Sequence, residues 1–127
     1  MDNLKTSMLQ AVSGMQVQSQ RMGITAENIS NADTPGYRRK LLVLTSETSR
    51  ADQFKAARVA LDETPGLRSH DPAHPMADED GYVTLSNVSL VMEVADMREA
   101  NRTYEANLNT FQQARSMYSS LLDVLRR

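Results

Sequence analysis

The C-terminal third of the chain carries the pattern that most constrains its fold. Apolar residues recur there at alternating steps of four and three, and only Asn101 and Arg115 interrupt them. This spacing is typical of a helix with one continuous apolar seam, as in coiled coils. It predicts a helix over residues 88–126, roughly 58 Å long. The seam comprises Leu90, Val94, Met97, Asn101, Tyr104, Leu108, Phe111, Arg115, Tyr118, Leu122 and Leu125.

A second, weaker helical pattern lies near the N-terminus. It predicts a helix over residues 2–30, roughly 43 Å long. Gly14 and Gly23 each weaken this helix by about 1 kcal/mol relative to alanine. Its seam comprises Leu4, Met8, Ala11, Met15, Gln18, Met22, Thr25 and Ile29.

Helices of these lengths limit how the chain can fold. A compact chain of 127 residues has a radius of gyration of about 14 Å, which is too small to enclose them. The helices therefore either pair as an antiparallel hairpin or bury their seams against other chains. The weak N-terminal helix favours ordering upon assembly.

The middle of the chain has short β-type runs instead of helical spacing. "KLLVLTS" (40–46), "ARVALDE" (57–63) and "GYVTLSN" (81–87) are rich in Val, Leu and Thr. The predicted fold is therefore mainly α, with a coiled-coil-like pair of terminal helices and a small irregular β-element inserted between them. The predicted parts are an N-terminal helical region (1–32), a turn-rich β-element (33–87) and a C-terminal helix (88–127).

A polar, turn-rich stretch ends the N-terminal helix. Asn28 and Asn31 are predicted to bond the backbone where the helix closes. Thr34-Pro35-Gly36-Tyr37 predicts a type II turn, since its third position needs a positive φ. Thr64-Pro65-Gly66-Leu67 repeats this chemistry. Asn28-Ile29-Ser30 also matches a glycosylation sequon, but nothing else in the sequence supports a secretory context.

Composition argues against several classes of function. The absence of Cys excludes disulfides, thiolate metal sites and a cysteine nucleophile. The net charge of −2 argues against nucleic acid or an anionic membrane as the main partner. No apolar run has the length of a membrane span, and no cleavable signal peptide is visible. Taken alone, these features favour the cytoplasm.

The candidate chemical sites fail on spacing. Pro72 lies between His70 and His74 and blocks the helical geometry that would bring two imidazoles together. The acidic run 78–81 lacks the glycine and glutamate positions of a calcium loop and predicts a solvated turn. Arg38-Arg39-Lys40 either pairs with a neighbouring subunit or forms a solvated turn edge. No catalytic spacing appears, so neither an enzyme nor a cofactor is predicted.

Three blocks of sequence resemble a known family. "AENISNADTPGYRRK" (26–40) is similar to the N-terminal signature of bacterial flagellar rod and hook proteins. "HPMADEDGYV" (74–83) and "NVSLVMEVADMREANRTYEANLNTF" (87–111) resemble proximal-rod members of that family. The resemblance covers nearly the whole chain.

The resemblance implies a non-enzymatic subunit of the flagellar rod, the drive shaft that spans the periplasm. Members are exported unfolded by the flagellar type III export apparatus, without a cleaved signal. The implied partners are copies of the same chain, other proximal and distal rod subunits, and the adaptor between the rod and the MS ring. Neither nucleic acid nor direct membrane insertion is implied.

The terminal helices of the family pack together and against neighbours to form an inner tube. This implies an assembly interface formed by the two seams. Asn101, a polar residue in an apolar seam, is expected to fix its register at some cost in stability. Three alternatives remain: a free-standing cytosolic coiled-coil adaptor, another rod subunit, or a small Ca²⁺- or metal-dependent binding module or enzyme built around residues 70–81. The interface residues expected here are Leu4, Met8, Ala11, Met15, Met22, Ile29, Leu90, Val94, Met97, Asn101, Tyr104, Leu108, Phe111, Tyr118, Leu122 and Leu125.

Overall fold

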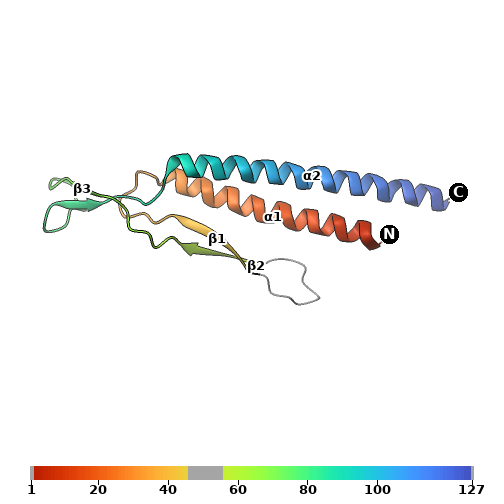
Figure 1. The fold of residues 1–127 in the computed structure, drawn as a ribbon, viewed down its shortest axis with the longest axis horizontal. Helices are drawn as coiled ribbons and strands as arrows, with labels where there is room; N and C mark the ends of the chain where they lie inside the picture. Colours follow the sequence, from red (N-terminus) through yellow and green to blue (C-terminus); the bar gives the residue numbers. More distant parts are fainter. Residues whose placement is uncertain (1, 46–55, 127) are drawn as a thin grey trace.

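Two long helices in contact with each other dominate the fold. The computed structural model describes residues 2–45 and 56–126. Helix α1 (Asp2–Ser30) and helix α2 (Leu90–Arg126) lie side by side and antiparallel, so both chain ends lie at the same end of the molecule (Figure 1). The predicted mainly α fold is confirmed. Of the two alternatives for the helices, pairing within one chain is therefore realised.

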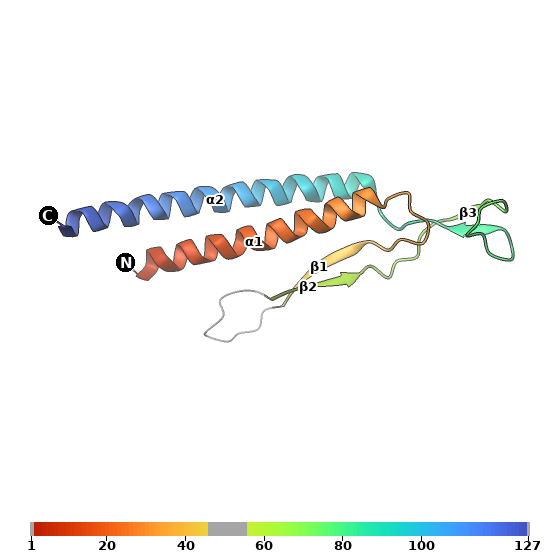
Figure 2. The ribbon, with the colours of Figure 1, turned by 180° about the vertical axis from the view of Figure 1, so that it is seen from behind.

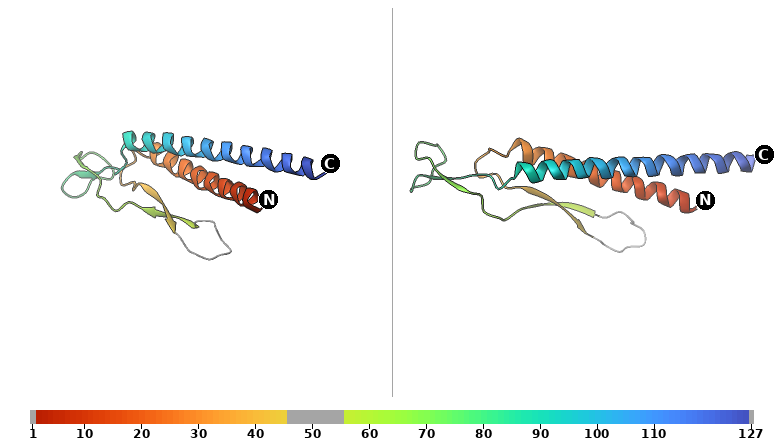
Figure 3. Two further views of the ribbon diagram at one scale, coloured as in Figure 1. Left: turned by 45° about the vertical axis from the view of Figure 1, so that its right-hand side comes forward. Right: turned by 45° about the horizontal axis from the view of Figure 1, so that its top comes forward.

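Two small antiparallel sheets lie between the helices in sequence. Strands β1 (Lys40–Thr45) and β2 (Ala56–Leu61) form a hairpin in which Lys40 pairs with Leu61 and Thr45 with Ala56. This hairpin runs back along α1 (Figures 2 and 3). Strands β3 (Arg68–His70) and β4 (Tyr82–Thr84) form the second sheet, at the end of the molecule opposite the chain termini.

The three predicted β-type runs match strands only in part. Residues 62–63 and 85–87 continue past the ends of β2 and β4 without strand pairing, and residue 46 lies outside the described residues. Strand β3 was not predicted, because three exposed residues carry no recognisable alternation.

The chain has little hydrophobic core of its own. Within residues 2–45 and 57–126, the buried hydrophobic residues are Ala11, Val83, Ala100 and Ala114. In that part of the chain, seventeen large hydrophobic residues are exposed, and nine of these lie on α2. The accessible surface is 9337 Å², whereas a compact monomer of 14.2 kDa exposes about 6,800 Å². A large apolar surface therefore remains exposed on this chain.

The predicted α2 seam covers only one flank of the face that packs on α1. The buried positions are Glu93, Ala100 and Ala114, whereas Asn101 and Arg115 are exposed. Each of these three buried residues lies one position before a residue of the predicted seam. Small alanines suit a close helix–helix approach, while the larger side chains lie beside it. Asn101 therefore does not set the register of the α1–α2 pair.

The predicted seam residues divide accordingly between partly buried and exposed positions. Every seam residue of α1 is buried or partly buried: Leu4, Met8, Ala11, Met15, Gln18, Met22, Thr25 and Ile29. On α2, the partly buried ones are Met97, Tyr104, Phe111, Tyr118 and Leu122. The exposed ones are Leu90, Val94, Asn101, Leu108, Arg115 and Leu125.

The two glycines of α1 differ in their surroundings, which gives a matched prediction. A Cβ at Gly23 would meet nothing within 4 Å, so Gly23→Ala is expected to raise the free energy of unfolding by up to about 1 kcal/mol. A Cβ at Gly14 would lie 2.6 Å from Nδ2 of Asn107 on α2, so Gly14→Ala is expected to bring no such gain. Urea unfolding monitored by circular dichroism checks both variants, and equal gains would contradict the prediction.

Candidate assembly site

The polar stretch after α1 contains the type II turn that its sequence predicts. The Tyr37 amide donates to the Thr34 carbonyl oxygen over 3.2 Å, and Gly36 has a φ of 76°. Asn31 closes the helix, since its Nδ2 donates to the Glu27 carbonyl oxygen over 2.9 Å. Its Oδ1 accepts a hydrogen bond from the Thr34 hydroxyl over 3.1 Å.

Asn28 bonds backbone groups as predicted, but these belong to Lys40 at the start of β1, and its side chain also reaches Glu93 on α2. Its Nδ2 donates to the Lys40 carbonyl oxygen over 3.0 Å and to Oε2 of Glu93 over 3.3 Å. Its Oδ1 accepts from the Tyr37 hydroxyl over 2.8 Å and from the Lys40 amide over 2.9 Å. With 1% of Asn28 exposed and both ends of its amide bonded, the sequon is inaccessible in the folded chain.

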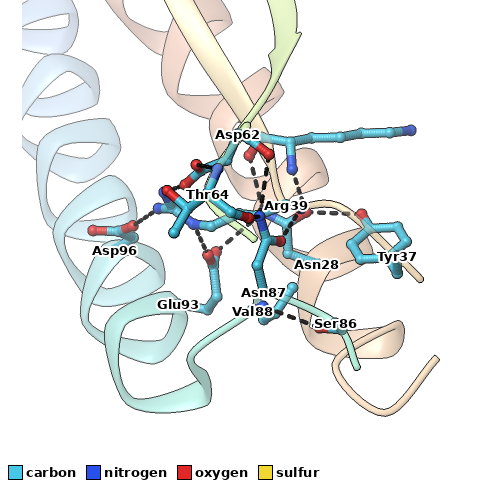
Figure 4. A network of polar contacts seen from close by, with 11 residues as sticks. Asn28, Tyr37, Arg39, Asp62, Thr64, Ser86, Asn87, Val88, Glu93 and Asp96 are labelled. Atoms are coloured by element: carbon cyan, nitrogen blue, oxygen red, sulfur yellow. Dashed lines mark hydrogen bonds and ion pairs between the residues drawn. The ribbon is translucent and has the colours of Figure 1, made fainter. Parts of the chain in front are cut away.

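Arg39 connects the β1–β2 hairpin to the start of α2 (Figure 4). Its Nε pairs with Oε1 of Glu93, which is 1% exposed. Its two Nη atoms lie 2.9 Å from Oδ2 of Asp96 and 3.8 Å from Oδ2 of Asp62. The basic triplet is therefore not a uniformly solvated edge, because Arg39 is paired within its own chain and Lys40 pairs with Glu27.

Asn87 fastens the segment before α2 to the same place. Its Oδ1 accepts from the Arg39 amide over 2.6 Å, and its Nδ2 donates to the carbonyl oxygens of Asp62 (3.1 Å) and Thr64 (2.8 Å). We call Asn28, Tyr37, Arg39, Asp62, Asn87 and Glu93 the junction cluster. It joins the end of α1, both strands of the hairpin and the start of α2.

The electrostatics of the junction cluster favour the protonation states that these contacts need. Burial lowers the pKa of Arg39, but the hydrogen bond and charge of Glu93, with Asp96 and Asp62, outweigh it and raise the pKa overall. Burial, followed by the charge of Glu27, raises the pKa of Tyr37. The backbone hydrogen bond from Thr64 lowers the pKa of Asp62. At neutral pH, Arg39 and Asp62 are thus charged. Tyr37 stays protonated, so its hydroxyl can donate the hydrogen bond to Asn28.

The second Thr-Pro-Gly segment does not form the predicted type II turn. Within the described residues, positive φ values occur at Gly36 and Gly81 but not at Gly66. Gly66 is needed for space, because a Cβ there would lie 1.9 Å from the Leu85 carbonyl oxygen. This close approach lets the Leu85 amide donate to the Leu67 carbonyl oxygen over 2.7 Å.

The residues considered for metal binding have structural contacts in the β3–β4 unit. His70 packs edge-on against Tyr82, with ring centroids 4.9 Å apart. Nδ1 of His74 accepts from the Met76 amide over 3.0 Å. Oδ1 of Asp78 accepts from the amides of Asp80 and Tyr82, as expected for a turn. In the described part of the chain, no three potential ligands lie close enough together to hold a metal ion.

The exposed apolar residues of α2 form the second part of the candidate site. Near the C-terminus they border a groove of about 640 Å³, which we call the terminal groove. The groove is lined by Leu4, Gln113, Ser116, Met117, Ser120, Leu121 and Val124.

None of the described helices is both long enough and apolar enough to cross a membrane.

Sequence reasoning missed most of the junction cluster. Glu93 carried a usable signal, because it is an acidic residue within the otherwise apolar run of residues 90–94. Asp62 and Asn87 carried none, since their roles depend on residues distant in the sequence. The structure has no further feature that suggests chemistry in the residues described here. The junction cluster holds α1, the β1–β2 hairpin and α2 together, and α2 leaves apolar residues exposed. These are the features of a structural subunit that assembles with other chains.

Comparison with known proteins identifies the family. Residues 8–38 match the family described as "Flagella basal body rod protein", and residues 79–124 match "Flagellar basal body rod FlgEFG protein C-terminal". The chain is 41% identical to the flagellar basal-body rod protein FlgC of Agrobacterium fabrum, over 99% of this chain and 98% of that protein. It is 30% identical to FlgC of Borreliella burgdorferi, over 91% of this chain and 93% of the relative. The chain therefore belongs to the FlgC family of flagellar basal-body rod proteins.

Proposed function

We propose that this chain is a structural subunit of the proximal rod, which transmits torque through a helical assembly of terminal helices. The observation that carries the proposal is the long helical pair with nine large hydrophobic residues of α2 exposed. Full burial of each such side chain stabilises an assembly by about 1.5–3 kcal/mol. The assembly residues include both the predicted seam and the exposed face that it does not cover, with Val91, Met117, Leu121 and Val124.

Membership of the family implies assembly with rod proteins. The proposed partners are copies of this chain, the other proximal and distal rod subunits, and the adaptor that joins the rod to the MS ring. We propose export by the flagellar type III apparatus without a cleaved signal. The rod spanning the periplasm is then the final location.

Isolation of basal bodies tests this function directly. A tagged chain expressed in its own cells is expected to co-purify with intact basal bodies and to be absent from them when the export apparatus is deleted. A discrete soluble oligomer retained in the cytosol would instead support the coiled-coil adaptor.

Circular dichroism of the isolated chain tests whether α1 becomes ordered only upon assembly. A fully helical isolated chain that melts cooperatively would contradict this expectation.

Gly36→Val is expected to block incorporation into the rod while leaving export intact. The φ of 76° at Gly36 is strongly unfavourable for a β-branched residue, so the chain would leave α1 in a different direction. Immunoblots of basal bodies and of the exported fraction measure the two steps separately. Normal rods containing the variant would overturn the prediction.

A further inference from the structure

The β1–β2 hairpin has an apolar face that α1 covers only in part. Leu42 pairs with Val59 and Leu44 pairs with Ala57, so these four side chains share one face with Leu61. This face is turned toward the helices, because Leu44 borders a groove together with residues of α1 and α2 (Figures 2 and 3). Val59 and Leu61 are nevertheless 55% and 54% exposed. The half of the face that lies on β2 is therefore uncovered.

The groove beside Leu44, which we call the hairpin slot, has a volume of about 390 Å³. None of the residues that line it is charged, although charged residues make up 24% of the chain. Depletion of charged residues is the compositional mark of the centre of a protein–protein interface. The hairpin slot and the open half of the hairpin face are therefore suited to burial against another chain. The slot is lined mainly by Gln10, Ser13 and Val17 of α1, Thr103 and Asn107 of α2, and Leu44 of β1.

The terminal groove is a second uncharged surface. No charged residue lines it, and residues 116–122 contain none. Met117, Leu121 and Val124 follow steps of four and three, which places them on one face of α2, and all three are exposed. In the part of the chain that the structure describes, α1 exposes one large hydrophobic residue, Leu9, whereas α2 exposes nine. Of the two helices, α2 therefore has the apolar surface that could cover the hairpin.

We propose that the terminal-groove face of α2 in one copy packs in the hairpin slot of a second copy, against Val59 and Leu61. Within one chain the two surfaces cannot meet, because the same helix lines both of them at different positions. In the second copy, the incoming helix would lie beside α1 and continue the packing that α1 begins on β1. The proposal rests on the proposed rod function and names one contact through which copies meet.

The other exposed apolar group of α2, at residues 90–94, fits the hairpin slot less well. Arg98 is exposed and lies four residues after Val94, on the same face of the helix. Packing this group in the slot would bring a guanidinium into an uncharged surface, where burial of an unpaired charge is costly. The face with Met117 and Leu121 brings only Gln113, Ser116 and Ser120 with it.

Disulfide crosslinking tests this contact, because the chain has no cysteine of its own. A variant with both Val59→Cys and Leu121→Cys replaces the chain in its own cells, and purified basal bodies are oxidised and separated without reductant. A disulfide requires Cα atoms within about 7 Å, so it reports direct packing. The expected result is linked copies of the chain that reductant separates. Absence of linked copies although the variant is incorporated would overturn the proposal, as would linkage to a different rod protein.

Arg58→Cys combined with Leu121→Cys is the matched control. Arg58 precedes Val59 and is also exposed, but the alternation of the strand places it on the opposite face of the hairpin. This pair is expected to give no linked copies, and neither is Val59→Cys alone or Leu121→Cys alone. Linkage through Arg58→Cys as strong as through Val59→Cys would overturn the proposal. A linked dimer from either single variant would also overturn it, because that contact joins like surfaces.

A second test needs no cysteine. Val59→Glu is expected to lower the amount of chain in basal bodies at least about tenfold, because the contact would bury an unpaired carboxylate. Arg58→Glu is expected to leave incorporation unchanged, and circular dichroism checks that both variants fold. Equal incorporation of the two variants, measured by immunoblot, would overturn the proposal. Absence of even the unaltered chain from basal bodies would instead reject the proposed rod function.

Discussion

Replacing Arg39 by alanine is expected to lower the free energy of unfolding by about 3 kcal/mol, the lower end of the cost of breaking a buried ion pair. Glu93 is 1% exposed, so the variant leaves a buried carboxylate without its cationic partner. It also removes the ion pair with Asp96. Urea unfolding monitored by circular dichroism measures the loss.

Arg38 provides the matched control for this variant. It precedes Arg39 and is exposed, so Arg38→Ala is expected to change stability by no more than about 0.5 kcal/mol. Adding Glu93→Gln to Arg39→Ala removes the buried charge and is expected to recover part of the loss. Equal urea midpoints for Arg38→Ala and Arg39→Ala would show that the junction cluster does not stabilise the fold.

Gly66→Ala is expected to cost about 2–3 kcal/mol, as overpacking of a tight contact does. Its Cβ would lie 1.9 Å from the Leu85 carbonyl oxygen and 2.9 Å from the Leu85 carbonyl carbon. These are backbone atoms, so the contact cannot be relieved by rotation of a side chain. The segments before β3 and after β4 must move apart, which breaks the hydrogen bond from the Leu85 amide to Leu67.

Gly36→Ala separates this clash from the general cost of replacing a glycine. A Cβ at Gly36 would meet nothing within 4 Å, so only the positive φ opposes alanine there, at about 1–2 kcal/mol. Hydrogen exchange is expected to speed up at the Leu85 amide in Gly66→Ala and to stay unchanged there in Gly36→Ala. Unchanged exchange at Leu85 in both variants would contradict the steric role of Gly66.

The helices could be predicted from the sequence because their pattern is local. The spacing from Leu90 to Leu125 repeats often enough to define α2 almost to its ends. The face of α2 that contacts α1 could not be predicted in the same way. Two neighbouring faces of α2 have the same four-three spacing. The face that includes Asn101 carries the larger apolar residues, so the sequence favoured it. In the structure, α1 packs closely on the face that includes Ala100 and Ala114.

The junction cluster was beyond sequence reasoning for a related reason. Asn28, Arg39, Asp62, Asn87 and Glu93 are brought together only by the path of the whole chain. Gly66 shows a second limit, because Thr-Pro-Gly has the same letters at both sites. Glycine serves a positive φ at Gly36 but a close backbone approach at Gly66, and only the structure distinguishes the two.

The junction cluster holds α2 at its N-terminal end, where Glu93 lies in the first turn. From there the helix, with 37 residues, extends about 55 Å to its C-terminal end. A rotation of only about 5° at the cluster would displace the far end of α2 by about 5 Å, which is close to one full turn of helix. A few buried polar contacts thus set the accuracy with which a subunit meets neighbours several nanometres away.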